Sequence, residues 1–222
     1  EEISKYCASI TSGIAAHSSL ATWPIYQFGT EEQKMRFLPE LLSGRAWGAM
    51  GLTEPGAGSD AAMQQTKAYL DGDHYVVNGR KCFITNAGEA KYYTTVVMTD
   101  KTKGNKGMSI LVIPADAPGF TIGKHEKKMG IRASATADLI FDNCIVPKEN
   151  LIGREGDGFK MIMQTLDVGR LGVGAIGLGI AEGAIEETLK YVSQRKQFGK
   201  TIGSFQNTQF ELADMKTRVE AA

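Results

Sequence analysis

The spacing of apolar residues changes twice along the chain. In residues 1–44 it is helical, with a repeat of three or four positions. That repeat consists of Ile3, Cys7, Ile10 and Ile14. Residues 46–150 instead contain short runs rich in β-branched and aromatic side chains, separated by turn signals. The runs are His74–Asn78, Tyr92–Met98, Ser109–Ile113 and Ala137–Phe141, and the turn signals are Asp71–Asp73, Asn78–Gly79, Lys103–Asn105 and Ala117–Gly119. From Gly158 onward the helical period returns.

Two of the helical segments carry further signals. Thr30–Gln33 has the pattern of a capping box, in which the threonine oxygen accepts from a free amide and the glutamine reaches back. After Gly158 one helical face is apolar, and an oppositely charged pair, Glu186 and Lys190, lies on another. The apolar face consists of Leu178, Ala181, Ile185, Leu189 and Val192. A second helix is predicted after Gly203, and it carries Leu212, Met215 and Val219.

Glycine is unusually frequent, with 26 of 222 residues, and several glycines fall inside the predicted helix after Asp167. They are Gly172, Gly174, Gly177, Gly179 and Gly183. Each costs up to about 1 kcal/mol relative to alanine in a helix interior, so close packing is expected to offset them. Gly179 and Gly183 share one face, where either another helix or a ligand could approach, and helix packing is the favoured interpretation.

Helices, strands and helices without βαβ alternation predict an α+β fold and disfavour a Rossmann fold. We expect residues 1–45 to be the end of a helical domain, residues 46–150 a central antiparallel β domain of barrel or sandwich type, and residues 151–222 the start of a helical bundle. The sequence begins at Glu1 and ends at Ala222 inside helical patterns, so the chain is interpreted as an internal part of a longer protein.

Composition and charge argue against several classes of protein. With 222 residues, 42% of them hydrophobic, the chain can bury a sizeable core and is not expected to be disordered. Its 25 basic and 25 acidic residues cancel, which argues against a nucleic-acid partner or an anionic membrane surface. The longest uncharged apolar stretch, Leu171–Ala181, is shorter than the roughly 20 residues that span a bilayer, so no membrane span is predicted.

Cysteines and histidines are few and scattered. They are Cys7, Cys82, Cys144, His17, His74 and His125. No C-x-x-C pair or other ligand spacing occurs among them, so neither a disulfide framework nor a metal site is predicted. Free thiols favour a reducing compartment.

The segment Thr53–Asp60 (TEPGAGSD) follows an apolar run and carries two glycines flanked by proline and hydroxyl residues. Such a loop allows a ligand to approach the backbone closely and offers several hydrogen-bond donors. A tight turn without any ligand has the same composition, so the residues alone leave both interpretations open.

The segment Lys81–Gly88 (KCFITNAG) is the second candidate. Phe83 and Thr85 are two apart, so on a strand they project from the same face. The ring could cover a planar ligand while the hydroxyl donates to its edge. Phenylalanine and threonine are also ordinary strand residues, so a purely structural role remains open here as well.

Five motifs in this order resemble the acyl-CoA dehydrogenase family, and the resemblance covers essentially the whole chain. They are Thr53–Asp60, Asn78–Lys81, Phe83–Gly88, Met129–Arg132 and Gln194–Lys200. The sequence is most similar to the short-chain, butyryl-CoA-type members. The resemblance implies FAD held noncovalently between the central β domain and a four-helix bundle, with the acyl thioester on one face of the flavin.

The resemblance also implies which residues contact FAD. The backbone from Met50 to Ser59 and the Thr53 hydroxyl would meet the isoalloxazine edge. Phe83, where many relatives have tryptophan, would pack on the ring, and Thr85 would bond near N5. The full set is Met50, Leu52, Thr53, Gly58, Ser59, Phe83, Ile84, Thr85, Arg195, Gln197, Phe198 and Gln206.

Arg195, Gln197, Phe198 and Gln206 match positions that reach the FAD pyrophosphate or adenosine of a neighbouring subunit. A guanidinium suits a diphosphate, because its fixed fork meets two oxygens at once. Without the resemblance, Arg195 is equally well interpreted as a cation at the C-terminal end of a helix.

The acyl-CoA substrate is assigned to Ser59, Asp167 and Arg170 by the same resemblance. Asp167 and Arg170 are three apart, so on a helix they share one face and could hold one ligand together. The alternative, an ion pair on a solvated helix face, is common for such a spacing.

The reaction implied by the family is removal of an α-proton by a base and transfer of a β-hydride to the flavin. In most relatives the base is a glutamate that would lie C-terminal to Ala222, and in others it occupies the position of Gly169. No catalytic residue is therefore identified in this chain. Thioester-dependent flavin reduction by these 222 residues alone would contradict that expectation.

The predicted activity is FAD-dependent dehydrogenation of a short-chain acyl-CoA to the trans-2-enoyl-CoA, as in β-oxidation, with electrons passing to an electron-transfer flavoprotein. The resemblance implies a homotetramer, a dimer of dimers, in a bacterial cytoplasm or a mitochondrial matrix. An enoyl-CoA reductase, an acyl-CoA oxidase or a flavin monooxygenase on the same scaffold remains an alternative. So does a non-catalytic module that binds flavin or CoA.

Overall fold

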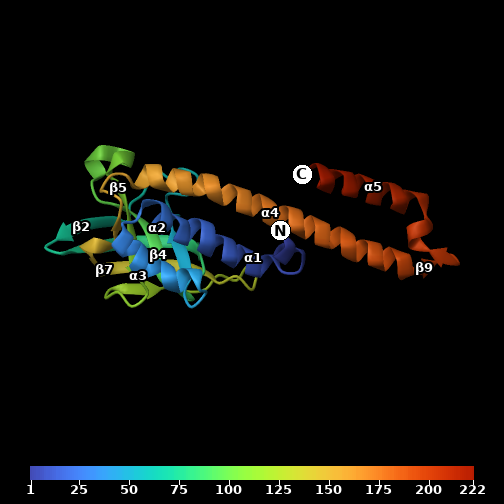
Figure 1. Cartoon of the computed structure of the whole chain (residues 1–222), viewed down its shortest axis with the longest axis horizontal. Helices are drawn as coiled ribbons and strands as arrows, with labels where there is room; N and C mark the ends of the chain where they lie inside the picture. The colour runs from blue at the N-terminus through green and yellow to red at the C-terminus, as the bar shows by residue number, and fades with distance from the viewer. The chain divides into compact units, whose positions relative to one another are not determined.

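The computed structural model describes residues 1–222. It divides into two compact units: residues 12–170 form the first, and residues 1–11 with 171–222 form the second. The helices are α1 (Ala8–Ala15), η2 (Ala16–Thr22), α2 (Trp23–Phe28), α3 (Glu31–Leu42), α4 (Gly158–Gln194) and α5 (Gln206–Ala221) (Figure 1). Short 3₁₀ turns are η1 (Glu2–Lys5), η3 (Lys101–Gly107), η4 (Lys148–Asn150) and η5 (Ile202–Ser204).

The strands lie almost entirely within the first unit. They are β1 (Trp47–Gly51), β2 (Lys67–Asp71), β3 (His74–Thr85), β4 (Ala90–Met98), β5 (Met108–Pro114), β6 (Phe120–Ile122), β7 (Thr136–Pro147) and β8 (Leu151–Ile152). A small hairpin of β9 (Lys196–Gln197) and β10 (Lys200–Thr201) belongs to the second unit.

One sheet follows the order β6-β7-β3-β2-β4-β5-β8. The pairs β2–β3, β3–β7, β6–β7, β4–β5 and β5–β8 are antiparallel. β1 adds to β4 in parallel, and β2 meets β4 in parallel at the single pair Lys67 and Met98. The α+β class is therefore confirmed, and the parallel pairing of β1 is a feature that the sequence pattern did not indicate.

The turn predicted at Asn78–Gly79 is wrong, because β3 continues through both residues with a register shift. Gly79 has φ of 149°, and a Cβ there would lie 2.6–2.8 Å from atoms of Thr66. The glycine thus allows close approach of a neighbouring segment rather than a chain reversal. The predicted turn at Asp71–Asp73 does join β2 to β3, with Gly72 at φ 62°.

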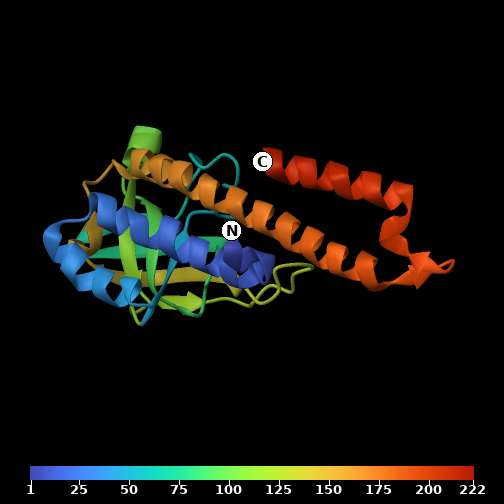
Figure 2. The same cartoon turned by 45° about the vertical axis from the view of Figure 1, so that its right-hand side comes forward.

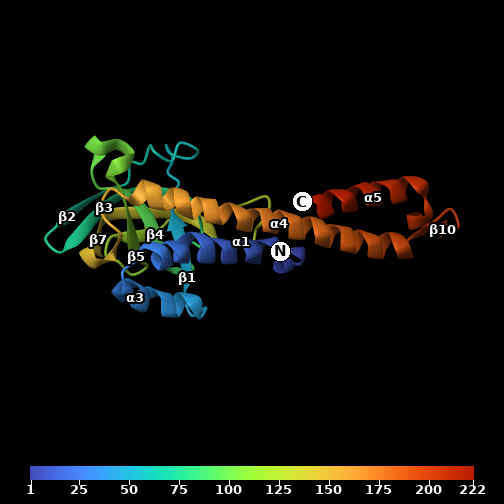
Figure 3. The same cartoon turned by 45° about the horizontal axis from the view of Figure 1, so that its top comes forward.

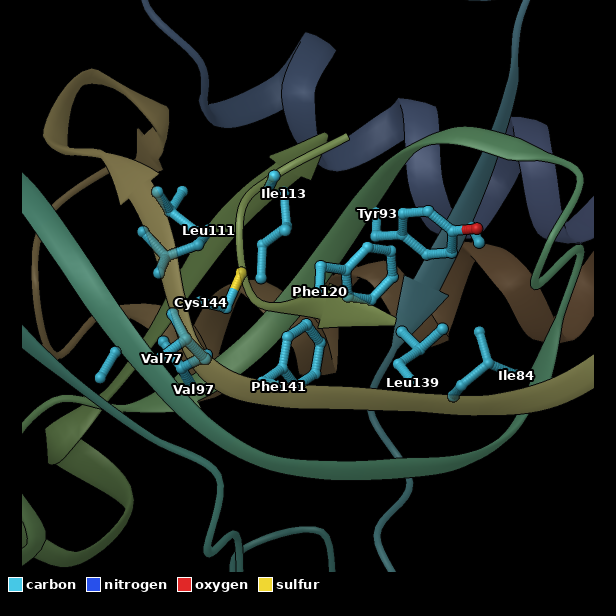
Figure 4. Close-up of a cluster of buried hydrophobic side chains, with 14 of the residues drawn as sticks. Val77, Ile84, Tyr93, Val97, Leu111, Ile113, Phe120, Leu139, Phe141 and Cys144 are labelled. Atoms are coloured by element: carbon cyan, nitrogen blue, oxygen red, sulfur yellow. The ribbon is translucent and has the colours of Figure 1, made fainter. Parts of the chain in front are cut away.

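The first hydrophobic core contains buried side chains from each of the strands β1 to β7 (Figure 4). Tyr93 of β4 contacts Phe120 of β6 with ring centroids 4.8 Å apart, and Phe120 stacks on Phe141 of β7 at 5.2 Å. Because β4 and β6 are distant in the strand order, the sheet curls over itself to make these contacts. This agrees with the predicted barrel or sandwich.

A second core lies between the other face of β4 and β5 and the helices. Phe37 and Leu41 of α3 share it with Val96, Ile110 and Met161, and all five are buried. The capping box predicted for α3 is confirmed, since Gln33 N donates to Thr30 Oγ1 and Thr30 N donates to Gln33 Oε1. The helix that packs on this core therefore also has a capped N-terminus.

The π-helical segment η2 is fixed to the sheet by polar contacts. Gly48 N donates to His17 Nδ1 at 2.9 Å, so the ring donates from Nε2 to the Leu41 carbonyl at 3.1 Å. Burial lowers the pKa of His17, which favours this neutral form. Thr94 Oγ1 also donates to the Ala21 carbonyl at 2.8 Å. In Figures 2 and 3, η2 runs beside the first turns of α4.

In the second unit, α5 runs back along the C-terminal part of α4 (Figure 1). Gly179 and Gly183 lie against the N-terminal turn: a Cβ at either would fall within 2.6 Å of Glu1 or Lys5 backbone. Helix packing is thus the role of these two glycines, whereas Gly172, Gly174 and Gly177 have open space around them.

The predicted pair of Glu186 with Lys190 is wrong. Lys190 Nζ lies 2.6 Å from Glu187 Oε1, three residues away, and Glu186 lies 3.8 Å from Lys5 Nζ instead. Spacings of three and four both bring helical side chains together, so the sequence could not choose between them.

By length and composition alone, α4 is long and apolar enough to cross a membrane. The sequence expectation counted only the uncharged run 171–181, whereas a span tolerates a few charges. Core helices of soluble proteins pass the same test, so this single helix is weak evidence for a membrane span.

Candidate functional site

A pocket of about 210 Å³ opens in the first unit where β1 and β3 end. Its walls are Ala16, Leu20, Met50, Leu52, Thr53, Phe83, Ile84, Thr85 and Leu166. Six of these are residues that the sequence assigned to the cofactor, and they come from two separate motifs. The structure therefore brings the Thr53 motif and the Phe83 motif together around one cavity.

The two motifs meet through the backbone. Cys82 N donates to the Thr53 carbonyl at 2.8 Å, so the chain after β1 runs beside the end of β3. Ala16 and Leu20 of η2 and Leu166 of α4 complete the apolar part of the wall. π-helical turns often occur at functional sites, and here the turn supplies two wall residues.

The hydroxyls of Thr53 and Thr85 are the polar groups of this wall. Both residues are half-buried, and neither side chain makes a hydrogen bond within the chain. They are consequently free to bond to the edge of a ligand, while the apolar residues cover its faces.

Phe83 lies in a β-bulge rather than in regular strand. Lys81 pairs with Leu139 and Ile84 with Ala137, so two residues of β3 oppose one residue of β7. Phe83 has φ of 58°, which is costly for an aromatic residue, and its side chain is 65% exposed. The bulge explains how Phe83, Ile84 and Thr85 all reach the pocket, which simple alternation along a strand would not allow.

Behind the pocket lies a buried ion pair that sequence reasoning missed. Lys81 is 0% exposed, and its Nζ donates to Glu54 Oε1 at 2.8 Å. Burial lowers the pKa of Lys81 to about 8, against the opposing effect of the Glu54 charge. Burial also acts to raise the pKa of Glu54, but the Lys81 charge and hydrogen bonds from Lys81 and Thr66 outweigh it, so this pKa lies below its usual value.

Asn86 is a second residue without a predicted role. Its φ is 65°, and its Nδ2 donates to the Gly13 carbonyl at 3.0 Å and the Gly48 carbonyl at 3.1 Å. It therefore fixes the end of β3 to both the helical segment and β1. The only signal in the sequence was position: Lys81 and Asn86 flank the short run Cys82–Thr85.

Gly58 and Ser59 do not line this pocket. Both are exposed, and a Cβ added at Gly56 or Gly58 would meet nothing within 4 Å. Glu54 and Ala57 exchange two backbone hydrogen bonds of 3.1 Å, which makes a tight turn directly before them. The loop thus contains a tight turn, as one interpretation of the sequence predicted, and then an open stretch of backbone that a ligand could approach, as the other requires.

Asp167 and Arg170 bond to each other on the exposed face of α4, with 2.7 Å between Oδ1 and Nη2. The solvated ion pair considered as an alternative is therefore what this structure shows. A neighbour on the same helix, Leu166, lines the pocket.

Gly169, the position of the base in some relatives, is buried against Leu20. A Cβ there would lie 2.7 Å from Leu20 Cδ2, so a carboxylate side chain would require that leucine to move. No acidic residue is among those that line the pocket.

The remaining predicted cofactor residues belong to the second unit. Arg195, Gln197, Phe198 and Gln206 are all exposed, and Phe198 is 92% accessible with φ of 52° in the turn between β9 and β10. Arg195 is fixed only through its backbone: its N donates to the Tyr191 carbonyl, and its carbonyl accepts from Ile202 N, both at 2.9 Å. Its guanidinium makes no ion pair within the chain.

Sequence profiles of the acyl-CoA dehydrogenase N-terminal, middle and C-terminal domains match residues 1–45, 49–144 and 156–222. The chain belongs to the acyl-CoA dehydrogenase family. Among members of this family, a short-chain-specific acyl-CoA dehydrogenase of Clostridium acetobutylicum is 51% identical over 222 residues, all of this chain and 59% of the relative.

Two further acyl-CoA dehydrogenase relatives bear on the site. The structure of butyryl-CoA dehydrogenase from Megasphaera elsdenii has a TM-score of 0.97 and 51% identity, over 99% of this chain and 58% of that one. An acryloyl-CoA reductase (NADH) of Anaerotignum propionicum is 49% identical over all of this chain and 56% of its own length. The chain thus spans somewhat more than half the length of the relatives it matches.

Proposed function

We propose that the protein containing this chain is an FAD-dependent acyl-CoA dehydrogenase that acts on short-chain thioesters. The observation that carries the proposal is the meeting of Thr53, Phe83 and Thr85 at one pocket, which brings two distant family motifs to a single ligand-sized site. The 51% identity to a short-chain-specific relative supports the substrate class.

The residues present fit a flavin. An exposed aromatic ring, two unpaired hydroxyls and an apolar wall suit a planar heterocycle with polar edges. When bound, FAD would supply the site that accepts a hydride from the substrate β-carbon. Phe83 would cover one part of the ring, Thr53 and Thr85 would bond to its edge, and Leu20 with Leu166 would exclude water.

Contacts to the CoA part of the substrate are proposed for Ser59, Asp167 and Arg170. Ser59 lies on the open backbone stretch after the Glu54 turn, where an extended ligand can approach. For Arg170 to bind a ligand, its 2.7 Å bond to Asp167 must be exchanged or shared. Because the pair is exposed and weak, that exchange costs little.

In the second unit, Arg195, Gln197, Phe198 and Gln206 are proposed to meet the FAD diphosphate and adenosine of a second copy. Their exposure supports this proposal, since the guanidinium fork of Arg195 is unpaired. We further propose a homotetramer that passes electrons to an electron-transfer flavoprotein in a reducing compartment. The three free cysteines are compatible with such a compartment.

The proposal is tested by the absorption spectrum of the intact purified protein, before and after anaerobic addition of butyryl-CoA. We expect a flavin spectrum that bleaches with butyryl-CoA, and reduced flavin that is reoxidised by an electron-transfer flavoprotein. A colourless protein that takes up no added FAD would overturn the proposal.

A second candidate is supported by one comparison, the 49% identical acryloyl-CoA reductase. The same pocket would then serve the reverse reaction, with NADH as the electron source. Steady-state assays separate the two: NADH-dependent reduction of acryloyl-CoA favours the reductase, and butyryl-CoA oxidation by the electron-transfer flavoprotein favours the dehydrogenase.

A further inference from the structure

The Lys81 ammonium makes three hydrogen bonds, and all three reach the chain segment that follows β1. Its Nζ donates to the Leu52 carbonyl at 3.3 Å, to Glu54 Oε1 at 2.8 Å and to Gln64 Oε1. A fully buried ammonium requires such a complete set of acceptors. Lys81 is consequently a cross-link between β3 and residues 52–64.

Glu54 fixes the same segment from the other side. Besides Lys81, its two oxygens accept from Gln65 N at 2.7 Å and from Thr66 N at 2.9 Å. Glu54 directly follows Thr53, and Thr66 directly precedes β2. The Glu54 carboxylate therefore joins the start of the segment 54–66 to its end, and so closes this segment into a loop.

The side-chain amide of Gln64 bonds to Lys81 at the expense of a hydrogen bond for its own NH₂ group. Its oxygen faces Lys81, and as a result its buried Nε2 has no hydrogen-bond partner. Leaving a buried donor unpaired is unfavourable, so the contact to Lys81 must outweigh that cost.

Neither charged residue touches the pocket. Glu54 and Lys81 are absent from its wall, whereas Thr53 and Phe83, which lie one and two positions away, belong to it. Lys81 is also the last regularly paired residue of β3 before the bulge. A fixed Lys81 thus holds one end of the strained backbone that presents Phe83.

We propose that Lys81 and Glu54 are positioning residues, which set the distance between the Thr53 and Phe83 walls and so preform the flavin site. The inference rests on the proposed flavin binding, but its geometric part concerns the FAD-free chain. Removal of the pair is expected to let the loop and the bulge move independently, so that FAD binding must first order them.

The test compares two variants of the intact protein: one in which the Lys81–Glu54 pair is neutralised, and a control in which another ion pair is neutralised. In Lys81→Met/Glu54→Gln the buried charges are removed together, which avoids leaving one of them unpaired. The matched control is Lys91→Met/Glu40→Gln: Lys91 of β4 pairs with Glu40 of α3 at 2.7 Å, and neither residue lines the pocket or touches the bulge.

We expect FAD to bind at least about tenfold more weakly to the K81M/E54Q variant, with an altered visible circular dichroism band of the bound flavin. The K91M/E40Q control should stay within about twofold of wild type and keep the wild-type band. FAD affinity and dichroism of K81M/E54Q that equal the wild-type values would overturn the inference.

Hydrogen exchange of the FAD-free proteins separates this inference from the proposed function. Faster exchange confined to residues 52–66 and 82–85 in K81M/E54Q, but not in the control, is the expected result. If wild type takes up no FAD, the proposed function is wrong, and the exchange data still decide whether the pair positions the two walls. If K81M/E54Q fails to fold, Gln64→Leu is measured instead, because it removes one acceptor of Lys81 and leaves the ion pair in place. Wild-type exchange and affinity in that variant would overturn the inference.

Discussion

The two regions that hold the predicted cofactor residues differ in how they use charge. Around the pocket of the first unit, the charges of Lys81 and Glu54 are buried and engaged in internal contacts, while the wall itself is apolar with two hydroxyls. In residues 195–206 of the second unit, the cation of Arg195 is exposed and unpaired. The charges of the first region thus hold the protein's own segments in place, whereas the charge of Arg195 in the second region is available to a ligand.

The difference suggests which kind of substitution each region tolerates. A buried charge has lost its water and depends on its partner, so removing that partner affects folding before it affects binding. An exposed charge keeps its water, so its removal affects binding alone. Four measurements test this contrast.

The largest effect is expected for Lys81→Met as a single change. It leaves the Glu54 carboxylate buried without its cation, which should lower the free energy of unfolding by about 3–5 kcal/mol. Urea unfolding of the variant and of K81M/E54Q provides the measurement. The double variant should recover most of the loss, and equal losses in both would show that the charge itself is not the cause.

A pH dependence should follow from the same lysine. Its pKa is about 8 in the folded chain, below the value of about 10.4 for an unburied lysine in the unfolded chain. Between these values the unfolded chain binds more protons, so the contribution of Lys81 to the free energy of unfolding increases with pH. Glu54, the ionisable group that faces it, stays charged throughout because its pKa is low.

We therefore expect the stability of wild type relative to K81M/E54Q to rise between about pH 7.5 and about pH 9.5. Urea unfolding at both pH values, with K91M/E40Q as the control, measures it. A constant difference across this range would contradict the assigned burial of the ammonium.

A smaller and opposite pair of effects is expected for Phe83→Gly. Glycine adopts φ of 58° without strain, so the FAD-free protein should gain about 1 kcal/mol of stability. Loss of the ring should weaken FAD binding about tenfold, or ~1.4 kcal/mol. Thermal unfolding and FAD titration check the two halves, and Phe83→Ala, which keeps the strain, serves as the control for stability.

The smallest effect is expected for Arg195→Lys, which keeps the charge and removes the fork. FAD affinity should fall about fivefold, or ~1 kcal/mol, while stability changes by less than about 0.5 kcal/mol. Lys196→Gln, which neutralises the exposed neighbouring cation, is the control and should leave affinity within about twofold. A loss of stability in R195K would remove the contrast between the two regions.

Local signals in the sequence predicted much of the fold. The capping box at Thr30 and the helices after Gly158 and Gly203 depend on short-range geometry and are confirmed. The turn at Asn78–Gly79 was wrong because glycine serves a close approach as readily as a turn, and only Thr66, on another segment, decides which. The parallel pairing of β1 with β4 likewise depends on residues far apart in the chain.

For the site, the family resemblance implied that Thr53, Phe83 and Thr85 contact one ligand, and the structure has all three at one pocket. The roles of these residues stay predictions. Lys81 and Glu54 lie within the motifs, but the sequence predicts no role for them, because charged side chains are normally solvated and burial depends on tertiary packing. The bulge at Phe83 was missed for the same reason, since it depends on the register of β7.

The parallel pairing of β1 has a consequence for the order of folding. Met50 pairs with Thr94, and the whole β2–β3 hairpin lies between them in the chain. Closing so long a loop is entropically slower than forming the hairpin or the antiparallel β4–β5 pair. The hairpins should form first and β1 should dock late. During synthesis the wall that contains Thr53 should therefore stay open until β4 has left the ribosome, and the pocket should be complete only once Leu166 of α4 has followed.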